Sequence, residues 1–255
     1  YSIAFMGTAL FAGLLLTVHR NIYRDATLYK ALFISFLLIL PNLWWQYNHN
    51  WPLIHHMKEL RETQLRYLDK TGFILDQFLM LFPVIWVWTG GLIWLLRRKT
   101  WQVLAYTYFI VVLLVLFGSG KNYYTLGAYP MLLAAGGVAW EQWIHQNRWK
   151  RYLLSGVIIL LTLLFIPILL PVWKPAKLAA FYRQSGVAKT GVLKWEDGRD
   201  HALPQDFADM LGWKELAEKT EAFYDSIEKP GDRKTLIYCR NYGQAGSLIF
   251  YGRCK

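Results

Sequence analysis

Six apolar stretches fill the first 172 residues of the chain, and polar loops separate them. The stretches are 2–18, 31–47, 76–96, 103–118, 126–144 and 152–173. The hydrocarbon core of a bilayer is about 30 Å thick, and a helix crosses it with roughly 17–25 apolar residues. Because backbone polar groups cannot remain unpaired in lipid, each stretch is predicted to be a membrane-spanning helix. The pattern predicts a polytopic α-helical membrane protein with about six spans in residues 1–172.

Basic residues gather in alternate loops. The short loops 19–30, 97–102 and 145–151 each carry three Lys or Arg residues, and two predicted spans separate each loop from the next. The three loops are therefore expected on one side of the membrane, which the positive-inside rule identifies as cytoplasmic. The opposite loop, 48–75, holds four basic residues that three acidic residues partly balance. This charge pattern places the N-terminus and everything after Trp173 outside the cytoplasm.

The pattern changes after Trp173 to that of a small soluble α+β domain, predicted for residues 174–255. Residues 187–195 and 235–239 have the composition of strands. Residues 206–227 show the apolar period of a helix, with Gly212 placed to split it. Residues 242–251 are predicted to form another helix, entered through a turn that contains glycine. The chain stops soon after this helix, so the domain is expected to be incomplete.

The composition supports the membrane assignment and indicates which classes of partner are expected. Hydrophobic residues make up 55% of the chain, and the 13 Trp lie mostly near the ends of the predicted spans, as in an interfacial belt. Residues 1–172 hold 14 basic against 6 acidic residues, a balance that reflects topology and anionic lipid. No basic stripe on a soluble face is evident, so nucleic acid is not an expected partner. Cys239 and Cys254 can pair if the tail faces an oxidising compartment, but their spacing alone does not establish a bond.

One polar segment, residues 41–56, borders the predicted outer leaflet. Its aromatic, amide and imidazole side chains suit stacking on sugar rings and hydrogen bonding to hydroxyls, so Asn48, His49, His55 and His56 are candidate contacts to an acceptor or sugar. A wet belt at the membrane edge is the simpler explanation of this stretch alone. The neighbouring histidines have no third ligand in sight, so no metal site is predicted. Soluble-enzyme motifs such as HExxH and GxSxG are absent from the sequence.

A second polar segment, residues 118–130, forms a very short outer loop between two predicted spans. Lys121 is its only charged residue. A single basic side chain at the membrane surface attracts an anion, and the phosphate of a lipid is the anion expected there. Tyr123 and Tyr124 suit either anchoring at the interface or flanking a polyprenyl-phosphate head. Contact with bulk lipid headgroups is the alternative for Lys121.

Several short segments follow one another in a fixed order along nearly the whole chain. They are Tyr1-Ser2, Pro41-Asn-Leu-Trp-Trp with Asn50-Trp-Pro52, Lys121-Asn-Tyr-Tyr-Thr-Leu-Gly-Ala-Tyr-Pro130, and residues 202–213 and 241–246 of the tail. Together they resemble the family 39 glycosyltransferases, the protein-mannosyltransferase-like group that includes bacterial aminoarabinose transferases. No single motif decides the resemblance, but the order of the motifs is specific.

The resemblance implies a GT-C type fold and transfer of a sugar from a polyprenyl-phosphate donor to an envelope acceptor, such as lipid A, a protein or a glycan. The reaction is expected at the outer face of the bacterial inner membrane, with Lys121, Tyr123 and Tyr124 at the donor phosphate. A divalent cation is an open option as cofactor. The resemblance also implies that the catalytic acidic residue precedes Tyr1, so the chain is expected to be an N-terminally truncated fragment. Neither Asp69 nor Asp76 is assigned as the base.

Two other classes of function remain open. A transporter or flippase of lipid-linked or envelope intermediates typically shows internal repeats and charges at the membrane midplane. The spans show no convincing repeat and almost no central ionisable residue, which disfavours that class. A membrane-anchored binding module, with the tail as its working part, is the third class. The sugar and the acceptor are not determined by the sequence.

Overall fold

The computed structural model describes residues 2–63, 70–145, 147–195, 197–227 and 235–252. Of the described residues 78% are helical, and none of them forms a strand. Two compact units divide it, Tyr1–Ile166 and Pro167–Lys255. The helical content agrees with the predicted membrane part, whereas the predicted α+β character of the tail is not observed.

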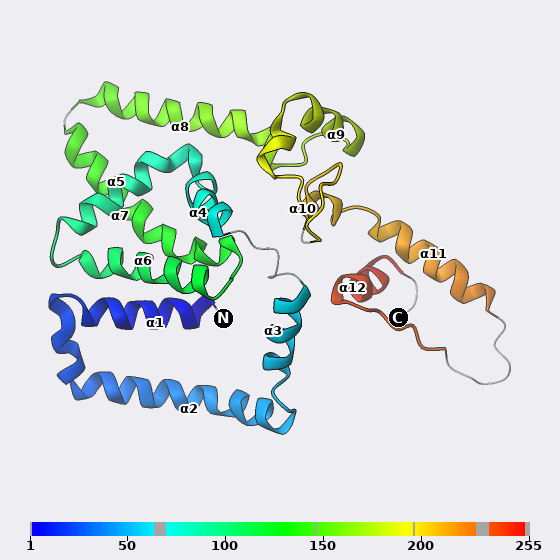
Figure 1. Cartoon of the computed structure of the whole chain (residues 1–255), viewed down its shortest axis with the longest axis horizontal. Coiled ribbons are helices and arrows are strands. Elements are labelled where there is room, and N and C mark those ends of the chain that lie inside the picture. Colours follow the sequence, from blue (N-terminus) through cyan, green and yellow to red (C-terminus); the bar gives the residue numbers. More distant parts are fainter. Residues whose placement is uncertain (1, 64–69, 146, 196, 228–234, 253–255) are drawn as a thin grey trace. The chain divides into compact units, whose positions relative to one another are not determined.

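The first unit is built from α-helices, with 3₁₀ segments between several of them (Figure 1). The α-helices are α1 (Ser2–Leu15), α2 (Ala26–Asn48), α3 (Pro52–Thr63), α4 (Lys70–Leu79), α5 (Ile85–Leu96), α6 (Gln102–Phe117), α7 (Tyr129–Ile144) and α8 (Arg148–Leu169), whose last three residues belong to the second unit. The 3₁₀ segments are η1 (Val18–Arg24), η3 (Phe82–Val84) and η4 (Asn122–Ala128). Asp25 caps α2 by accepting the Thr27 N–H, and this bond lowers the pKa of the Asp25 carboxyl.

Two helices are long and apolar enough to cross a membrane, α2 with 23 residues and α8 with 22. Two bent pairs raise the number to four: α1 with η1, bent by 105°, and α4 with the segment Phe82–Leu96, bent by 57°. Pro83 lies in the first turn of η3, where its missing N–H and its ring interrupt the predicted span 76–96. The described helices thus offer two to four spans, and a bundle of six stays a prediction.

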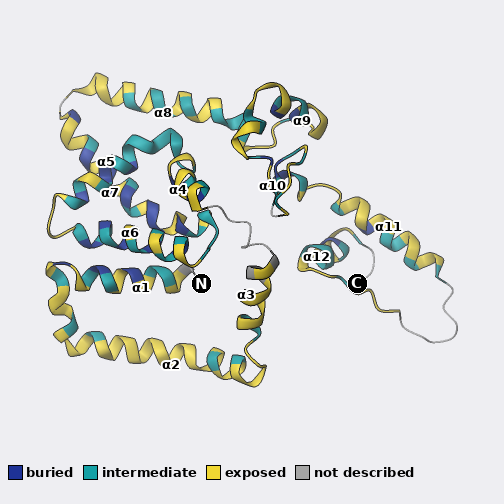
Figure 2. Cartoon of the chain, in the orientation of Figure 1, coloured by how far each residue is buried: buried dark blue, intermediate teal, exposed yellow. Residues whose placement is uncertain are grey.

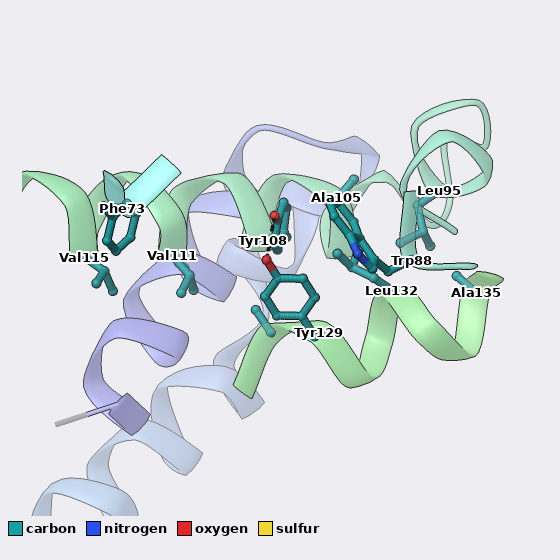
Figure 3. Packing of buried hydrophobic residues seen from close by; sticks show 12 residues of the cluster. Phe73, Trp88, Leu95, Ala105, Tyr108, Val111, Val115, Tyr129, Leu132 and Ala135 are labelled. Atoms are coloured by element: carbon teal, nitrogen blue, oxygen red, sulfur yellow. Dashed lines mark hydrogen bonds between the residues drawn. The ribbon is translucent and has the colours of Figure 1, made fainter. Parts of the chain in front are cut away.

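The core of the first unit lies where α5 packs against α7, with α6 beside them and α1 against α6. Two glycines bring α5 and α7 together: a Cβ built on Gly91 would lie 2.0 Å from the Leu132 carbonyl oxygen, and one on Gly136 would lie 2.0 Å from that of Val87. Only glycine permits this backbone approach. Figure 3 shows Trp88 and Tyr129 packed together in this core.

Helices α2 and α8 contrast with this core, because neither contains a buried residue. In Figure 2 the residues of both helices are exposed or intermediate along their length, although the composition of both is strongly apolar. Exposed apolar surface on this scale is unusual on a soluble domain. In a membrane the same surface is solvated by lipid.

The second unit contains short helices around a small apolar cluster. The elements are α9 (Pro175–Gln184), η5 (Val187–Thr190), α10 (Gln205–Ala208), α11 (Trp213–Ser226) and α12 (Tyr242–Tyr251). Leu178, Tyr182, Leu193 and Phe207 form the buried cluster. The Tyr182 hydroxyl donates to the Ile168 carbonyl oxygen at 2.7 Å, and burial raises the pKa of this phenol.

The two strands predicted for the tail do not form. Residues 187–190 are the 3₁₀ helix η5, flanked by Gly186 and Gly191 with φ of 76° and 83°. Among the described residues nearby, one bridge, between Lys194 and Asp200, is the sole β-type pairing. Residues 235–239 pair with no strand in the described part of the chain, and Leu236 is 89% exposed. A short apolar run without a partner strand cannot satisfy its backbone in a sheet.

The helices predicted for the tail are confirmed. The stretch 206–227 forms α10 and α11, and Gly212, with φ of 82°, separates them as its position suggested. Helix α12 has the predicted bounds 242–251, and Asn241 caps it by accepting the Gln244 N–H at 3.0 Å. Cys239 is half-buried. Whether it pairs with Cys254 was left open by the sequence, and Cys254 lies outside the described residues.

Candidate functional site

The segment that carries Lys121 follows a tight reversal of the chain after α6. Gly118 closes α6, Ser119 adopts a left-handed φ of 53°, and the Gly120 N–H donates to the Val115 carbonyl oxygen at 2.8 Å. A Cβ on Gly120 would lie 2.8 Å from Cγ1 of Val115, so a small residue is needed there. The reversal places Lys121 at the N-cap of η4.

Polar side chains fix η4 to α4. The Asn122 amide donates to Oδ2 of Asp76 at 2.8 Å, while its Oδ1 accepts the Tyr123 N–H at 2.8 Å. The Thr125 hydroxyl shares its hydrogen between Oε1 of Gln77, at 2.7 Å, and the Asn122 carbonyl oxygen, at 2.8 Å. Two consecutive residues of α4 therefore hold both ends of the first turn of η4.

The same network continues into the core. Gln77 is only 3% exposed, and its carbonyl oxygen accepts the Tyr129 hydroxyl at 2.8 Å. The Tyr129 and Tyr108 hydroxyls lie 3.4 Å apart, as the dashed line in Figure 3 marks. Buried polar groups that are all paired stabilise one arrangement of a core, because any displacement leaves a group unsatisfied. The position of η4 is therefore determined by contacts with α4, α6 and α7.

The three predicted phosphate-binding residues share this fixed segment. Lys121 is half-buried and its carbonyl oxygen accepts the Tyr124 N–H at 3.1 Å. Tyr123 is exposed, whereas Tyr124 is half-buried against the core. Their rings meet edge to face with centroids 4.8 Å apart. The segment thus presents an ammonium group and an exposed phenol from one rigid turn.

The other predicted residues lie around the junction of α2 and α3. Asn48 ends α2, and the His49 ring stacks on Trp45 at 4.4 Å while its Nδ1 lies 2.8 Å from the Trp45 carbonyl oxygen. His55 and His56 lie exposed on α3. The main described contacts of η4 are with α1, α4, α6 and α7, none of which carries these residues.

Sequence reasoning missed the supporting residues Asp76, Gln77, Asn122, Thr125 and Tyr129. The signal for the first two is an Asp-Gln pair at the start of an apolar stretch, since polar groups inside a span are costly unless they are paired. The opposite side of α4 borders an open depression of about 350 Å³ lined by Lys70, Thr71, Ile74, Leu75 and Phe78. No group of three His, Cys, Asp or Glu side chains suited to a metal occurs within the ranges that the structure describes.

No family model matches this chain, and no curated protein and no solved structure was found to be similar to it.

Proposed function

We propose that this protein is a membrane glycosyltransferase that takes a sugar from a polyprenyl-phosphate donor, and that Lys121 binds the donor phosphate. The segment-by-segment resemblance to the family 39 glycosyltransferases supports the class of reaction. The apolar helices support a membrane location. In this proposal the helices form a polytopic bundle in a bacterial inner membrane, with Lys121 and the second unit on the outer side.

The observation that carries the proposal is the anchoring of η4 by Asp76 and Gln77. A binding group contributes most when its neighbours already hold it in place, because little freedom is lost when the ligand arrives. Lysine presents a compact charge with three donors, which suits the oxygens of a phosphate. Lys121 combines both properties, since its backbone is fixed by the turn and its side chain is half-buried.

The proposed reaction breaks the bond between the anomeric carbon and the phosphate oxygen and forms a bond from that carbon to the acceptor oxygen. A general base takes the acceptor proton, and the polyprenyl phosphate leaves with the electron pair of the broken bond. Lys121 would stabilise the negative charge that grows on the leaving phosphate, with Tyr123 and Tyr124 beside it. Asn48, His49, His55 and His56 are proposed to contact the sugar or the acceptor.

Donor binding tests this proposal without knowledge of the sugar. The purified protein in detergent is titrated with undecaprenyl phosphate, and bound lipid is counted by native mass spectrometry. Lys121→Ala is expected to weaken binding about tenfold, because a charge-assisted hydrogen bond contributes about 1.5–3 kcal/mol. Lys189→Ala, which removes an exposed lysine from the second unit, is expected to leave the affinity unchanged.

Two results would contradict the proposal. Equal affinity of the wild type and Lys121→Ala for undecaprenyl phosphate would remove Lys121 from the site. Equal affinity of the wild type for undecaprenol, which lacks the phosphate, would show that the headgroup is not recognised. In membranes that contain the active enzyme, Lys121→Ala is expected to lower sugar transfer at least about tenfold.

A further inference from the structure

Hydrogen bonds connect two basic segments of the first unit to each other and to α7, just before a third basic segment. Nε2 of His19, in η1, lies 2.7 Å from the Thr100 carbonyl oxygen in the turn between α5 and α6. Arg98 in that turn donates to Oε1 of Gln142, near the end of α7, at 3.1 Å. Arg151 in α8 donates to the His145 carbonyl oxygen at 3.0 Å. The segments 19–30 and 97–102 are therefore bonded to each other, and 97–102 is bonded to α7 three residues before the segment 145–151. The three segments together hold nine basic residues.

Arg98 is held in place by neutral groups alone. Its Cζ lies 4.5 Å from the centroid of the Trp94 ring, and the Trp94 indole donates to the same Gln142 oxygen at 2.9 Å. A cation over an indole face keeps its charge while its orientation is fixed. No carboxylate pairs with Arg97, Arg98 or Lys99 in the described part of the chain.

Arg151 differs from Arg98 because it is paired with a carboxylate. Its guanidinium forms an ion pair with Glu141 at 2.6 Å, so much of its charge is neutralised within the protein. Arg97, Arg98 and Lys99 are exposed and have no such partner. They leave a positive surface that attracts an anion.

Exposed tryptophans lie within or next to the basic segments along the chain and indicate which kind of anion fits. Trp101, Trp143 and Trp149 are all exposed. Trp101 is the N-cap of α6, and the other two lie in the last turn of α7 and the first turn of α8. Amphipathic rings at such positions lie at the depth of lipid headgroups. Below them the helices expose apolar side chains, for example Ile93 on α5 and Leu153 on α8. A ligand at this end therefore meets cations at its head and apolar surface along its tail.

We propose that this basic end binds the phosphate of an anionic phospholipid, with Arg98 as its fixed contact and Arg97 and Lys99 beside it. The proposal goes beyond the transferase activity and does not depend on it. The cations supply the headgroup contact, and the exposed apolar flanks of α5 and α8 favour a phosphate that carries acyl chains over a free one.

The test measures lipid preference with the purified chain in nonionic detergent. Equal amounts of phosphatidylglycerol and phosphatidylcholine with the same acyl chains are added, and native mass spectrometry counts the retained lipids. The wild type is expected to retain more phosphatidylglycerol, and Arg98→Gln to lower this preference about fivefold. The double variant Arg97→Gln/Lys99→Gln leaves the Trp94 and Gln142 contacts of Arg98 intact and is expected to lower it at least as much.

The matched control is Lys177→Gln. It removes one charge from a second cation–tryptophan pair, since Lys177 Nζ lies 4.9 Å from the Trp173 ring in the other unit, and it is expected to keep the wild-type preference. If this control lost as much of the preference for phosphatidylglycerol as Arg98→Gln, the loss would be explained by net charge alone, and the proposal would be overturned. Wild-type preference in both the Arg98 variant and the double variant would overturn it too. Displacement of the lipid by glycerol 3-phosphate at equal concentration would assign the site to free phosphate instead.

Discussion

Helices α5 and α7 form a tightly packed pair, whereas α2 and α8 bury no residue, although all four are strongly apolar. The difference lies in their small residues. Gly91 and Gly136 let the backbones of α5 and α7 approach until no Cβ fits between them. The one glycine of α8, Gly156, has no neighbouring atom within 4 Å of an added Cβ, and α2 has no glycine. Small residues at a contact, rather than hydrophobicity, decide which apolar helices pair in a membrane.

The largest expected effect that tests this comparison is that of Gly136→Ala. The added methyl group would meet the Val87 backbone, which cannot move aside as a side chain would. Overpacking of this kind is expected to lower the free energy of unfolding by about 3 kcal/mol. Titration of the detergent-solubilised protein with SDS, followed by circular dichroism, measures the change.

Gly137→Ala is the matched control in the same helix. An added Cβ there has no atom within 4 Å, so the variant is expected to be as stable as the wild type or more stable by less than about 1 kcal/mol. Because alanine favours a helix more than glycine does, helix propensity cannot destabilise either variant. Equal destabilisation by the two alanines would therefore mean that α5 and α7 do not approach at Gly136 as described.

A smaller effect is expected from Tyr129→Phe, which tests the polar part of the same core. The variant removes the hydroxyl that donates to the Gln77 carbonyl oxygen at 2.8 Å and keeps the ring. A loss of about 1 kcal/mol in the free energy of unfolding is expected in the same SDS titration. Tyr152→Phe removes a hydroxyl from an exposed residue of α8 and should change nothing. A Tyr129→Phe variant as stable as the wild type would show that the network does not fix η4.

Hydrophobic pattern predicted the helices well and the tertiary contacts poorly. It located α12 at its observed bounds and the break at Gly212, because periodicity and glycine act locally. It proposed strands at 187–195 and 235–239, since a short apolar run resembles a strand whether or not a partner exists. It read 76–96 as one span, although Pro83 divides it into α4 and α5. Whether all six stretches cross the membrane stays a prediction.

In the candidate site too, the sequence predicted the residues that are close together in the chain and missed those that come from distant segments. Lys121, Tyr123 and Tyr124 are adjacent in sequence, so one short motif was enough to propose them together. The residues that hold them come from elsewhere: Asp76 is 46 positions from Asn122, and Gln77 is 48 positions from Thr125. Partners at such a distance depend on how α4 packs, which hydrophobic periodicity does not specify. His49, the C-cap of α2, and His55, in α3, are outside the elements that make the main described contacts with η4.

The most direct test is to determine on which side of the membrane Lys121 and the basic end lie. Single cysteines are introduced as Lys121→Cys or Lys99→Cys in a chain with Cys239 and Cys254 replaced by serine, and whole cells are treated with a membrane-impermeant maleimide. The account predicts labelling at position 121 in intact cells and at position 99 only after the membrane is permeabilised. Labelling of position 99 in intact cells, or of both positions from the same side, would contradict it.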